Sequence, residues 1–414
     1  MNQNRFGAYP TSFWALTFVG VIGWAGMVVT PLLTLYLTVQ LGLTPIVAGM
    51  ILSIYGVGGT VAVVFSGVVV DALGAKQVLI GAMAISVAMN IALSFATSIP
   101  LICVLVLIYG AAAQSMQPAY NTLVTETAPL FKLREAFSIQ MISGNLGFAT
   151  LPLIGGILAG LHYSLIFYFE SALVLAAMAI VITLIPLHVN ARGGSDGAGG
   201  AGSTIESPGV RSRLAFLIEM VGVFRDGVFL RFLIASIVYA TMFKQTQITM
   251  PLIMDEQGHG AGYYGFILTL NGLGVVLLQL PADRLTRRMN ASRVVVLGAL
   301  ITSAGLFLQA FANSAPSYAI IVVVWTVGEL FHFAISANIA SQLAPEGYRG
   351  RYLGVFALAN CVASLLGPLF GGFALELTGS TGLWLLCGSV LLALAVFRWA
   401  CRHEIDRRMG IAAA

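Results

Sequence analysis

A carboxylic acid and a histidine stand one helical turn apart inside a long apolar stretch of this sequence. The segment WTVGELFHF (325–333) lies within the apolar run 318–343, so Glu329 falls near the middle of that run. If the run crosses a membrane, a charge at its centre costs roughly 2.5–3.5 kcal/mol even on an insertion scale. We therefore predict that Glu329 exchanges a proton or contacts a ligand. A structural hydrogen bond to a neighbouring helix is the alternative.

Three further residues could take part in the same chemistry. His332 follows Glu329 on one helical face, and imidazole titrates nearest to neutral pH. Lys244, in ATMFKQTQITMP (240–251), could pair with Glu329, hold an anionic ligand, or extend to the membrane surface. Glu170, in IFYFES (166–171), is either a second proton site or an interfacial acid. The predicted proton-coupling set is therefore Glu329, His332, Lys244 and Glu170.

A polar stripe indicates a cavity wall. Gln114, Gln117, Tyr120 and Asn121 recur at i, i+3, i+6 and i+7, which places them on one side of a helix. Such a stripe is costly against lipid, so we expect it to line a wet cavity. For the other ligand-binding candidates, simple packing is the alternative. These candidates are Trp24, Asn145, Gln247, Asn271, Trp325 and Asn338.

The elements that position these residues follow from composition. Only 9% of the 414 residues are charged and the mean hydropathy is +0.94, whereas soluble domains carry about 25% charged residues. The apolar runs are long enough for membrane helices and lack the alternation of barrel strands. We predict an all-α polytopic membrane protein with twelve transmembrane helices. Their ranges are 12–39, 45–70, 77–97, 101–125, 135–160, 163–186, 229–255, 260–281, 292–312, 317–343, 351–377 and 381–401.

The basic residues predict the orientation. Every Lys and Arg except Lys244 falls on one side of the predicted spans. By the positive-inside rule, both termini are cytoplasmic and the number of spans is even. We expect a multi-pass protein of the plasma (inner) membrane.

The chain divides into two similar halves. The Gly/Ser-rich segment 188–213 is typical of a flexible linker. The predicted domains are a six-helix bundle (1–187), a cytoplasmic linker with a possible interfacial helix at 214–224 (188–228), a second six-helix bundle (229–401) and a cytoplasmic tail (402–414). SGVVVDALGAKQ (66–77) is echoed by LPADRLTRRMN (280–290), and GNLGFATLPLIGG (144–156) by NCVASLLGPLFGG (360–372). We therefore predict two pseudo-symmetric bundles.

These paired segments resemble the signatures of the major facilitator superfamily, and the resemblance covers all but the linker and tail. GVVVDALGAK (67–76) resembles the loop signature between its second and third helices, although Ala72 and Ala75 replace basic residues. LPLIGG and GPLFGG resemble the signature of its drug:proton antiporter group, although Leu151 replaces a glycine. The arginine usual in the fourth helix of that group is absent from 107–121.

The resemblance implies roles for two sets of residues. Asp71 would act as a latch between conformations, with helix capping as the alternative. The gating set is Asp71, Gly74, Lys76, Asp283 and Arg284, and for the last two a charge that only sets the membrane topology is the alternative. The Gly/Pro segments would form the interface on which the halves rock, with ordinary membrane-helix packing as the alternative. These residues are Pro152, Gly155, Gly156, Gly367, Pro368, Gly371 and Gly372.

The resemblance also implies a function. We expect a proton-coupled secondary transporter that exports small amphipathic or hydrophobic compounds by alternating access. The alternative is a proton symporter that takes up an anionic metabolite, with Lys244 as its counter-charge. No Walker A, HExxH or GxSxG sequence is present, and we expect neither enzyme activity nor a cofactor, metal or nucleic acid. The expected partners are a small-molecule substrate, protons and the lipid bilayer, and a monomer is expected.

Overall fold

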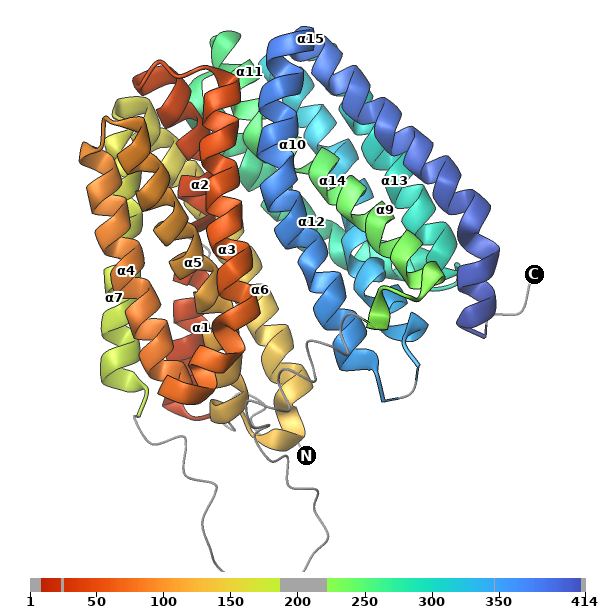
Figure 1. The fold of residues 1–414 in the computed structure, drawn as a ribbon, viewed down its shortest axis with the longest axis horizontal. Helices are drawn as coiled ribbons and strands as arrows, with labels where there is room; N and C mark the ends of the chain where they lie inside the picture. Colours follow the sequence, from red (N-terminus) through yellow and green to blue (C-terminus); the bar gives the residue numbers. More distant parts are fainter. Residues whose placement is uncertain (1–8, 24–25, 187–221, 346, 411–414) are drawn as a thin grey trace, which may run out of the picture.

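The computed structural model describes residues 9–23, 26–186, 222–345 and 347–410, and every regular element in these ranges is a helix (Figure 1). The predicted linker at 188–213 and Trp24 lie outside the described residues. So does most of the possible interfacial helix at 214–224.

The first half contains the first six predicted spans. α1 and α2 form the first span and run into the π-helical turn η2. The elements are α1 (Thr11–Gly23), α2 (Gly26–Leu35), η2 (Tyr36–Gln40), α3 (Pro45–Leu73), α4 (Ala75–Phe95), α5 (Ile99–Thr127), η3 (Leu130–Lys132), α6 (Leu133–Leu161) and α7 (Ser164–Leu184).

The second half supplies the other six spans. Its first span is interrupted twice, at Lys244 and Thr249, and so consists of three helices. The elements are α9 (Gly227–Phe243), α10 (Gln245–Ile248), α11 (Met250–Glu256), α12 (Gly260–Thr286), α13 (Ala291–Gln309), α14 (Ala315–Leu343) and α15 (Arg349–Arg408).

α15 accounts for the last two predicted spans. The helix folds back on itself at Gly379, whose φ of 69° and ψ of 179° are accessible to glycine and strained for other residues. The described helices therefore match all twelve predicted spans, and the predicted all-α membrane fold is confirmed.

The two ends of the bundle differ. We call the end where α1 begins and α15 ends the basic end, and the end where α3 and α12 begin the far end. The ribbons of the two halves approach each other at the far end, the top of Figure 1, and diverge toward the basic end.

Glycines allow the halves to touch at the far end. A Cβ added to Gly372 of α15 would lie 2.5 Å from the carbonyl oxygen of Pro45, the first residue of α3. One added to Gly156 of α6 would lie 2.6 Å from the carbonyl oxygen of Ala261 in α12. These separations leave no room for a side chain, so the backbones themselves form the contact.

The predicted Gly/Pro motifs divide between two kinds of contact. Pro152 and Gly156 face Gly265 of α12, while Pro368 and Gly372 face Gly49 of α3. These four motif residues therefore lie between the halves. By contrast, Gly367 and Gly371 face Lys244 and Gln245 of their own half, and Gly155 is buried.

The last helix extends beyond the predicted end of the bundle. Residues 402–408, expected in a solvated tail, continue α15. Asp406 is buried and its carboxylate accepts a hydrogen bond of 2.5 Å from Ser292, at the start of α13. Arg398, one of the basic residues used to predict the orientation, is 5% exposed and lies inside the second half. The helical periodicity of α15 turns both residues toward the neighbouring helices, which the position of a residue near a chain end does not reveal.

Candidate functional site

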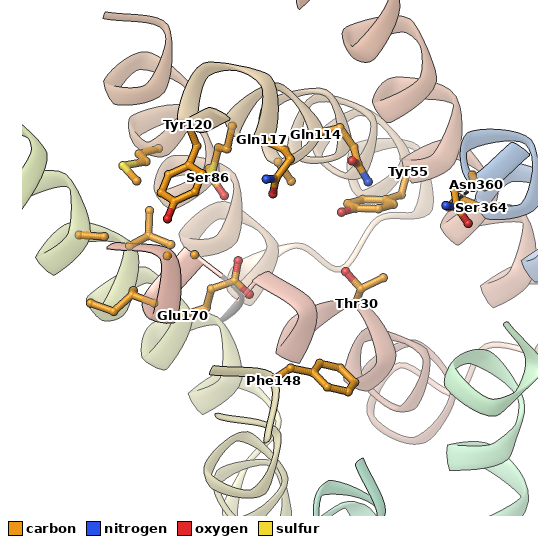
Figure 2. Close-up of a pocket in the computed structure, with 18 of the residues that line it drawn as sticks. Thr30, Tyr55, Ser86, Gln114, Gln117, Tyr120, Phe148, Glu170, Asn360 and Ser364 are labelled. Carbon is orange, nitrogen blue, oxygen red and sulfur yellow. Dashed lines mark hydrogen bonds between the residues drawn. The ribbon is translucent and has the colours of Figure 1, made fainter. Parts of the chain in front are cut away.

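A cavity of about 720 Å³ lies between the two halves. This volume falls in the range of small-molecule sites, about 300–1,000 Å³. The far-end glycine contacts lie on one side of it, and its lining reaches toward the basic end along α5 and α6. Its polar lining residues are Thr30, Tyr55, Ser86, Gln114, Gln117, Tyr120, Asn121, Gln140, Glu170, Lys244, Gln247, Asn360 and Ser364 (Figure 2).

Glu170 supplies a carboxylate to the wall of the first half. It lies on α7 and is 1% exposed. Its Oε1 accepts a hydrogen bond of 2.6 Å from the hydroxyl of Tyr109. Within the described part of the chain, its Oε2 has no hydrogen-bond partner at standard geometry, and no cation is within ion-pair distance. Oε2 is therefore a buried acceptor without a partner, in a residue that lines the cavity.

Lys244 supplies a cation to the opposite half. It occupies the break between α9 and α10, where its backbone N–H still donates to the carbonyl of Ala240 at 3.0 Å. A Cβ added to Gly367 of α15 would lie 3.3 Å from its Cβ. The next residue, Gln245, donates to the carbonyl of Gly367 at 2.9 Å and thereby ties α10 to α15. Among the described residues, Lys244 forms no ion pair.

The stripe on α5 lies in the cavity wall. Gln117 donates to Asn121 at 3.0 Å, and the hydroxyl of Tyr120 bonds to Gln140 of α6 and to the carbonyl of Leu16. All four members of the stripe, and Gln247, line the cavity. Their role in binding a substrate stays a prediction.

Glu329 lies outside the cavity lining. Its Oε2 accepts a hydrogen bond of 2.8 Å from Asn271 of α12, which also donates to Thr326 at 3.0 Å. Neither Glu329 nor Asn271 lines the cavity. The expected ion pair between Lys244 and Glu329 does not form, because Lys244 faces α15 and the cavity while Glu329 faces α12. The geometry around Glu329 matches the structural alternative.

His332 contacts a buried arginine instead of Glu329. Nη1 of Arg398 lies 3.0 Å from Nδ1 of His332, and its Nη2 donates to Ser236 at 3.2 Å. Because a guanidinium only donates, Nδ1 must accept and carries no proton. The imidazole also stacks on Tyr239 with a centroid distance of 3.3 Å and an interplanar angle of 11°. These contacts give His332 a structural setting apart from the cavity.

The other binding candidates do not line this cavity. Trp325 is 2% exposed and packs against Phe243, Asn145 is half-buried in α6, and Asn338 is exposed and accepts from Gln342 at 3.0 Å. The spans of these candidates were predicted correctly, but a span alone does not show which way a side chain faces.

The gating candidates lie at the basic end. Gly74, with φ of 88°, separates α3 from α4, and Asp71 is exposed in the last turn of α3. Nζ of Lys76 donates to the carbonyls of Ile182 and Ile185 at 3.1 and 2.5 Å, so it caps the end of α7.

In the second half, Asp283 accepts from Gln279 at 3.1 Å, and Arg284 is exposed. The latch stays a prediction.

Several residues of the site were missed from the sequence. Tyr109 has no polar neighbour in sequence that would distinguish it from packing aromatics. Asn360 and Ser364 were detectable, since they precede Pro368 by two turns and one turn and so share its face of α15.

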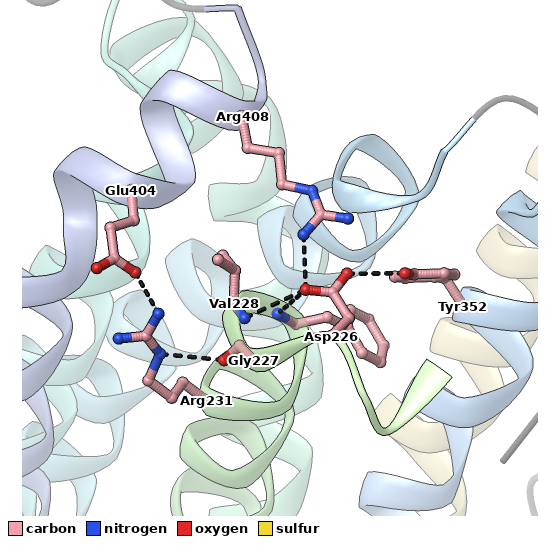
Figure 3. Close-up of polar contacts among 8 residues, drawn as sticks. Asp226, Gly227, Val228, Arg231, Tyr352, Glu404 and Arg408 are labelled. Atoms are coloured by element: carbon pink, nitrogen blue, oxygen red, sulfur yellow. Dashed lines mark hydrogen bonds and ion pairs between the residues drawn. The ribbon is translucent and has the colours of Figure 1, made fainter. Parts of the chain in front are cut away.

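A second group of charges lies at the basic end and is fully paired (Figure 3). Asp226 caps α9 through the N–H groups of Val228 and Phe229, each at 3.2 Å. It also accepts from Arg408 at 2.6 Å and from Tyr352 at 2.7 Å. Burial alone would raise the pKa of Asp226, but these hydrogen bonds outweigh it and hold the pKa below its usual value. We call Asp226, Tyr352 and Arg408 the clamp.

Two helical bundles around a central cavity define a membrane transporter fold. A family model of the Major Facilitator Superfamily matches residues 13–264 and 232–409. The chain therefore belongs to the major facilitator superfamily, and it is a multi-pass membrane transport protein.

The relatives are distant but cover most of the chain. A Na(+), Li(+), K(+)/H(+) antiporter of Planococcus maritimus is 25% identical over 96% of this chain and 94% of its own. The multidrug resistance protein MdtH of Edwardsiella ictaluri is 22% identical over 90% of this chain and 89% of its own.

Solved structures share the fold. The peptide transporter POT in complex with sulfate has a TM-score of 0.81 at 16% identity, covering 98% of this chain and 97% of that one. The nucleoside transporter NupG has a TM-score of 0.78 at 16% identity, covering 95% and 99%.

Proposed function

We propose that this protein is a proton-coupled secondary transporter that exports small amphipathic compounds, with Glu170 as the proton carrier in place of Glu329. The observation that carries this proposal is that Glu170 is the one carboxylate among the described residues that line the cavity.

The physical argument concerns the cost of an unpaired charge. Glu170 is buried, and Tyr109 supplies one hydrogen bond, while no described cation lies within ion-pair distance. Ionisation in such a site is costly without a partner. The carboxyl group is therefore neutral when the cavity holds no cation, and it releases its proton when a cationic group or water reaches it. This exchange couples substrate binding to proton release.

One relative supports proton-coupled exchange, and another supports drug-like substrates. One is named for the exchange of monovalent cations for protons and the other for multidrug resistance. A cavity lined by Tyr55, Phe148, several amides and apolar side chains suits small amphipathic compounds.

The glycine contacts support alternating access. With the halves in backbone contact at the far end, the cavity lies on the basic-end side of that contact. Exposing it to the other side requires α3 to separate from α15 and α6 from α12. In this proposal the basic end faces the cytoplasm, as the positive-inside rule predicts.

Lys244 favours a second candidate function. A cation that faces the cavity and has no ion pair with a described residue could hold an anionic metabolite during proton-driven uptake. Symport and antiport differ in the direction of the proton relative to the substrate, so flux measurements separate them.

The test uses proteoliposomes that enclose a pH-sensitive dye. Candidate compounds are added on one side, and the native protein is compared with Glu170→Gln, Glu329→Gln and Glu126→Gln. We expect substrate-driven proton movement to be lost in Glu170→Gln and retained in the other two. Glu126 is a matched control, since it is a half-buried glutamate of α5 outside the cavity lining. Full coupling in Glu170→Gln would refute the assignment, and loss in Glu329→Gln alone would return the role to Glu329.

A further inference from the structure

Two opposite charges face the same cavity from different halves of the protein. Among the described residues that line it, Glu170 and Lys244 are the only charged ones. Neither forms an ion pair with another residue of the described ranges. Buried charges in proteins are normally paired with each other or with a ligand. A cavity that keeps an acid and a base apart therefore offers both to whatever enters it.

The two charges lie at opposite sides of the cavity. Figure 2 shows Glu170 on one side, Asn360 and Ser364 on the other, and Thr30 and Tyr55 between them. Lys244 belongs to the side of Asn360 and Ser364, because it packs on Gly367 of the same α15 face. The charges therefore flank a central region that carries a tyrosine.

The surroundings of each charge reinforce this division. Near Glu170, Oε2 of the acid has no hydrogen-bond partner in the described part of the chain. A carboxylate oxygen accepts hydrogen bonds, as an ammonium group requires. On the other side, Lys244, Gln247 and Asn360 line the cavity with N–H donors that suit an anionic oxygen.

We infer that the cavity selects an amphoteric substrate that carries an amine at one end and a carboxylate at the other, with the amine at Glu170 and the carboxylate at Lys244. This inference rests on the proposed function, since it takes the cavity as the transport site. The amino and acidic groups must lie at opposite ends of the molecule, because the two charges do not meet across the cavity.

The same arrangement explains how substrate and proton would exclude each other. A protonated Glu170 loses its proton when the substrate ammonium binds, which leaves a carboxylate–ammonium pair and one free proton. Charge is conserved in this step. Export of a net-neutral amphoteric molecule in exchange for one entering proton moves one positive charge inward per cycle. Transport would then be driven by the membrane potential, at roughly 2.3 kcal/mol per 100 mV.

The test measures binding of ω-aminocarboxylic acids with three to eleven methylene groups to the purified full-length protein by isothermal titration calorimetry. Each compound is compared with its N-acetyl form, which lacks the cation, and with its carboxamide form, which lacks the anion. We expect one chain length to bind best. Acetylation of its amine or amidation of its carboxylate should each weaken that binding at least 10-fold.

Two variants test which residue binds each end of the substrate. In Glu170→Gln, acetylation of the amine should change the affinity less than 2-fold, while amidation of the carboxylate still weakens binding. In Lys244→Met the pattern should be reversed. Glu126→Gln should behave as the native protein. The inference is overturned if no member of the series binds, or if acetylation and amidation leave the affinity unchanged at every chain length. It is also overturned if both variants lose affinity for all the compounds equally.

Proton release separates this inference from the proposed function. If acetylation and amidation have no effect on affinity but Glu170→Gln abolishes substrate-driven proton flux in proteoliposomes, only the amphoteric specificity is refuted. If both ends of the substrate are recognised but Glu170→Gln retains substrate-driven proton flux, only the role of Glu170 in proton coupling is refuted.

Discussion

The cavity and the clamp contain the same kinds of charged groups in opposite situations. At the clamp, Asp226 meets Arg408 at 2.6 Å and two backbone N–H groups. In the cavity, Glu170 and Lys244 lie on different halves and stay apart. The clamp satisfies its charges within one half and thereby stabilises it. The cavity leaves its charges for a partner that comes and goes, which is what binding and release require.

The largest expected effect is on transport, and Glu170→Gln measures it. We expect at least a 100-fold fall in substrate-driven proton flux, because the proton carrier is removed. The melting temperature in detergent should stay the same or rise, since a buried acid without an ion pair is replaced by a neutral amide. A variant that loses stability and transport together would show that Glu170 resembles Asp226 after all.

The clamp should show the opposite pattern in Asp226→Asn. Removing the charge weakens the bonds to Arg408 and Tyr352, and breaking charged hydrogen bonds costs about 1.5–3 kcal/mol. We expect a lower melting temperature with less than a 5-fold change in flux. Tyr352→Phe, which loses one bond, should show a smaller shift. An unchanged melting temperature would contradict a stabilising role for the clamp.

The contribution of Asp226 should depend on pH in a known direction. Its pKa in the folded protein lies below the unfolded value of about 3.9. Its stabilisation is therefore present above that value and lost as the pH falls through the lower, folded pKa. The difference in melting temperature between the native protein and Asp226→Asn should be constant above about pH 5 and shrink below pH 4. A difference that grows on acidification would refute this assignment.

The smallest effect is expected at the exposed pair beside the clamp. Arg231 and Glu404 form an ion pair with side chains 44% and 48% exposed. Exposed pairs contribute about 0.2–1 kcal/mol and are screened by salt. Glu404→Gln should therefore lower the melting temperature slightly at low ionic strength and not at all at high salt. A shift as large as that of Asp226→Asn would show that exposure does not distinguish the two pairs.

The sequence was sufficient for the fold because the membrane makes each span recognisable. A span needs a long apolar run, and these runs matched the described helices. The polar stripe on α5 was also visible, since four polar residues on one side of a helix reveal its orientation.

The choice between the deep acids needed the structure. The segments around Glu170 and Glu329 are apolar on nearly every side, so periodicity does not show which way either helix is rotated. Glu329 looked central because it is deep, and its neighbour His332 looked like a partner because it is near in sequence. Packing joined them instead to Asn271 and Arg398, which are distant in sequence.

The clamp has a consequence for how the protein is made. Arg408 follows Asp226 by 182 residues, and six spans, that of α9 included, are synthesised between them. At about 5–20 residues per second, the ribosome needs roughly 10–40 s to cover that distance. During this interval α9 is already in place but lacks its arginine. The second half therefore closes late in translation, and a nascent chain stalled before Arg408 would expose Asp226 to quality-control proteases.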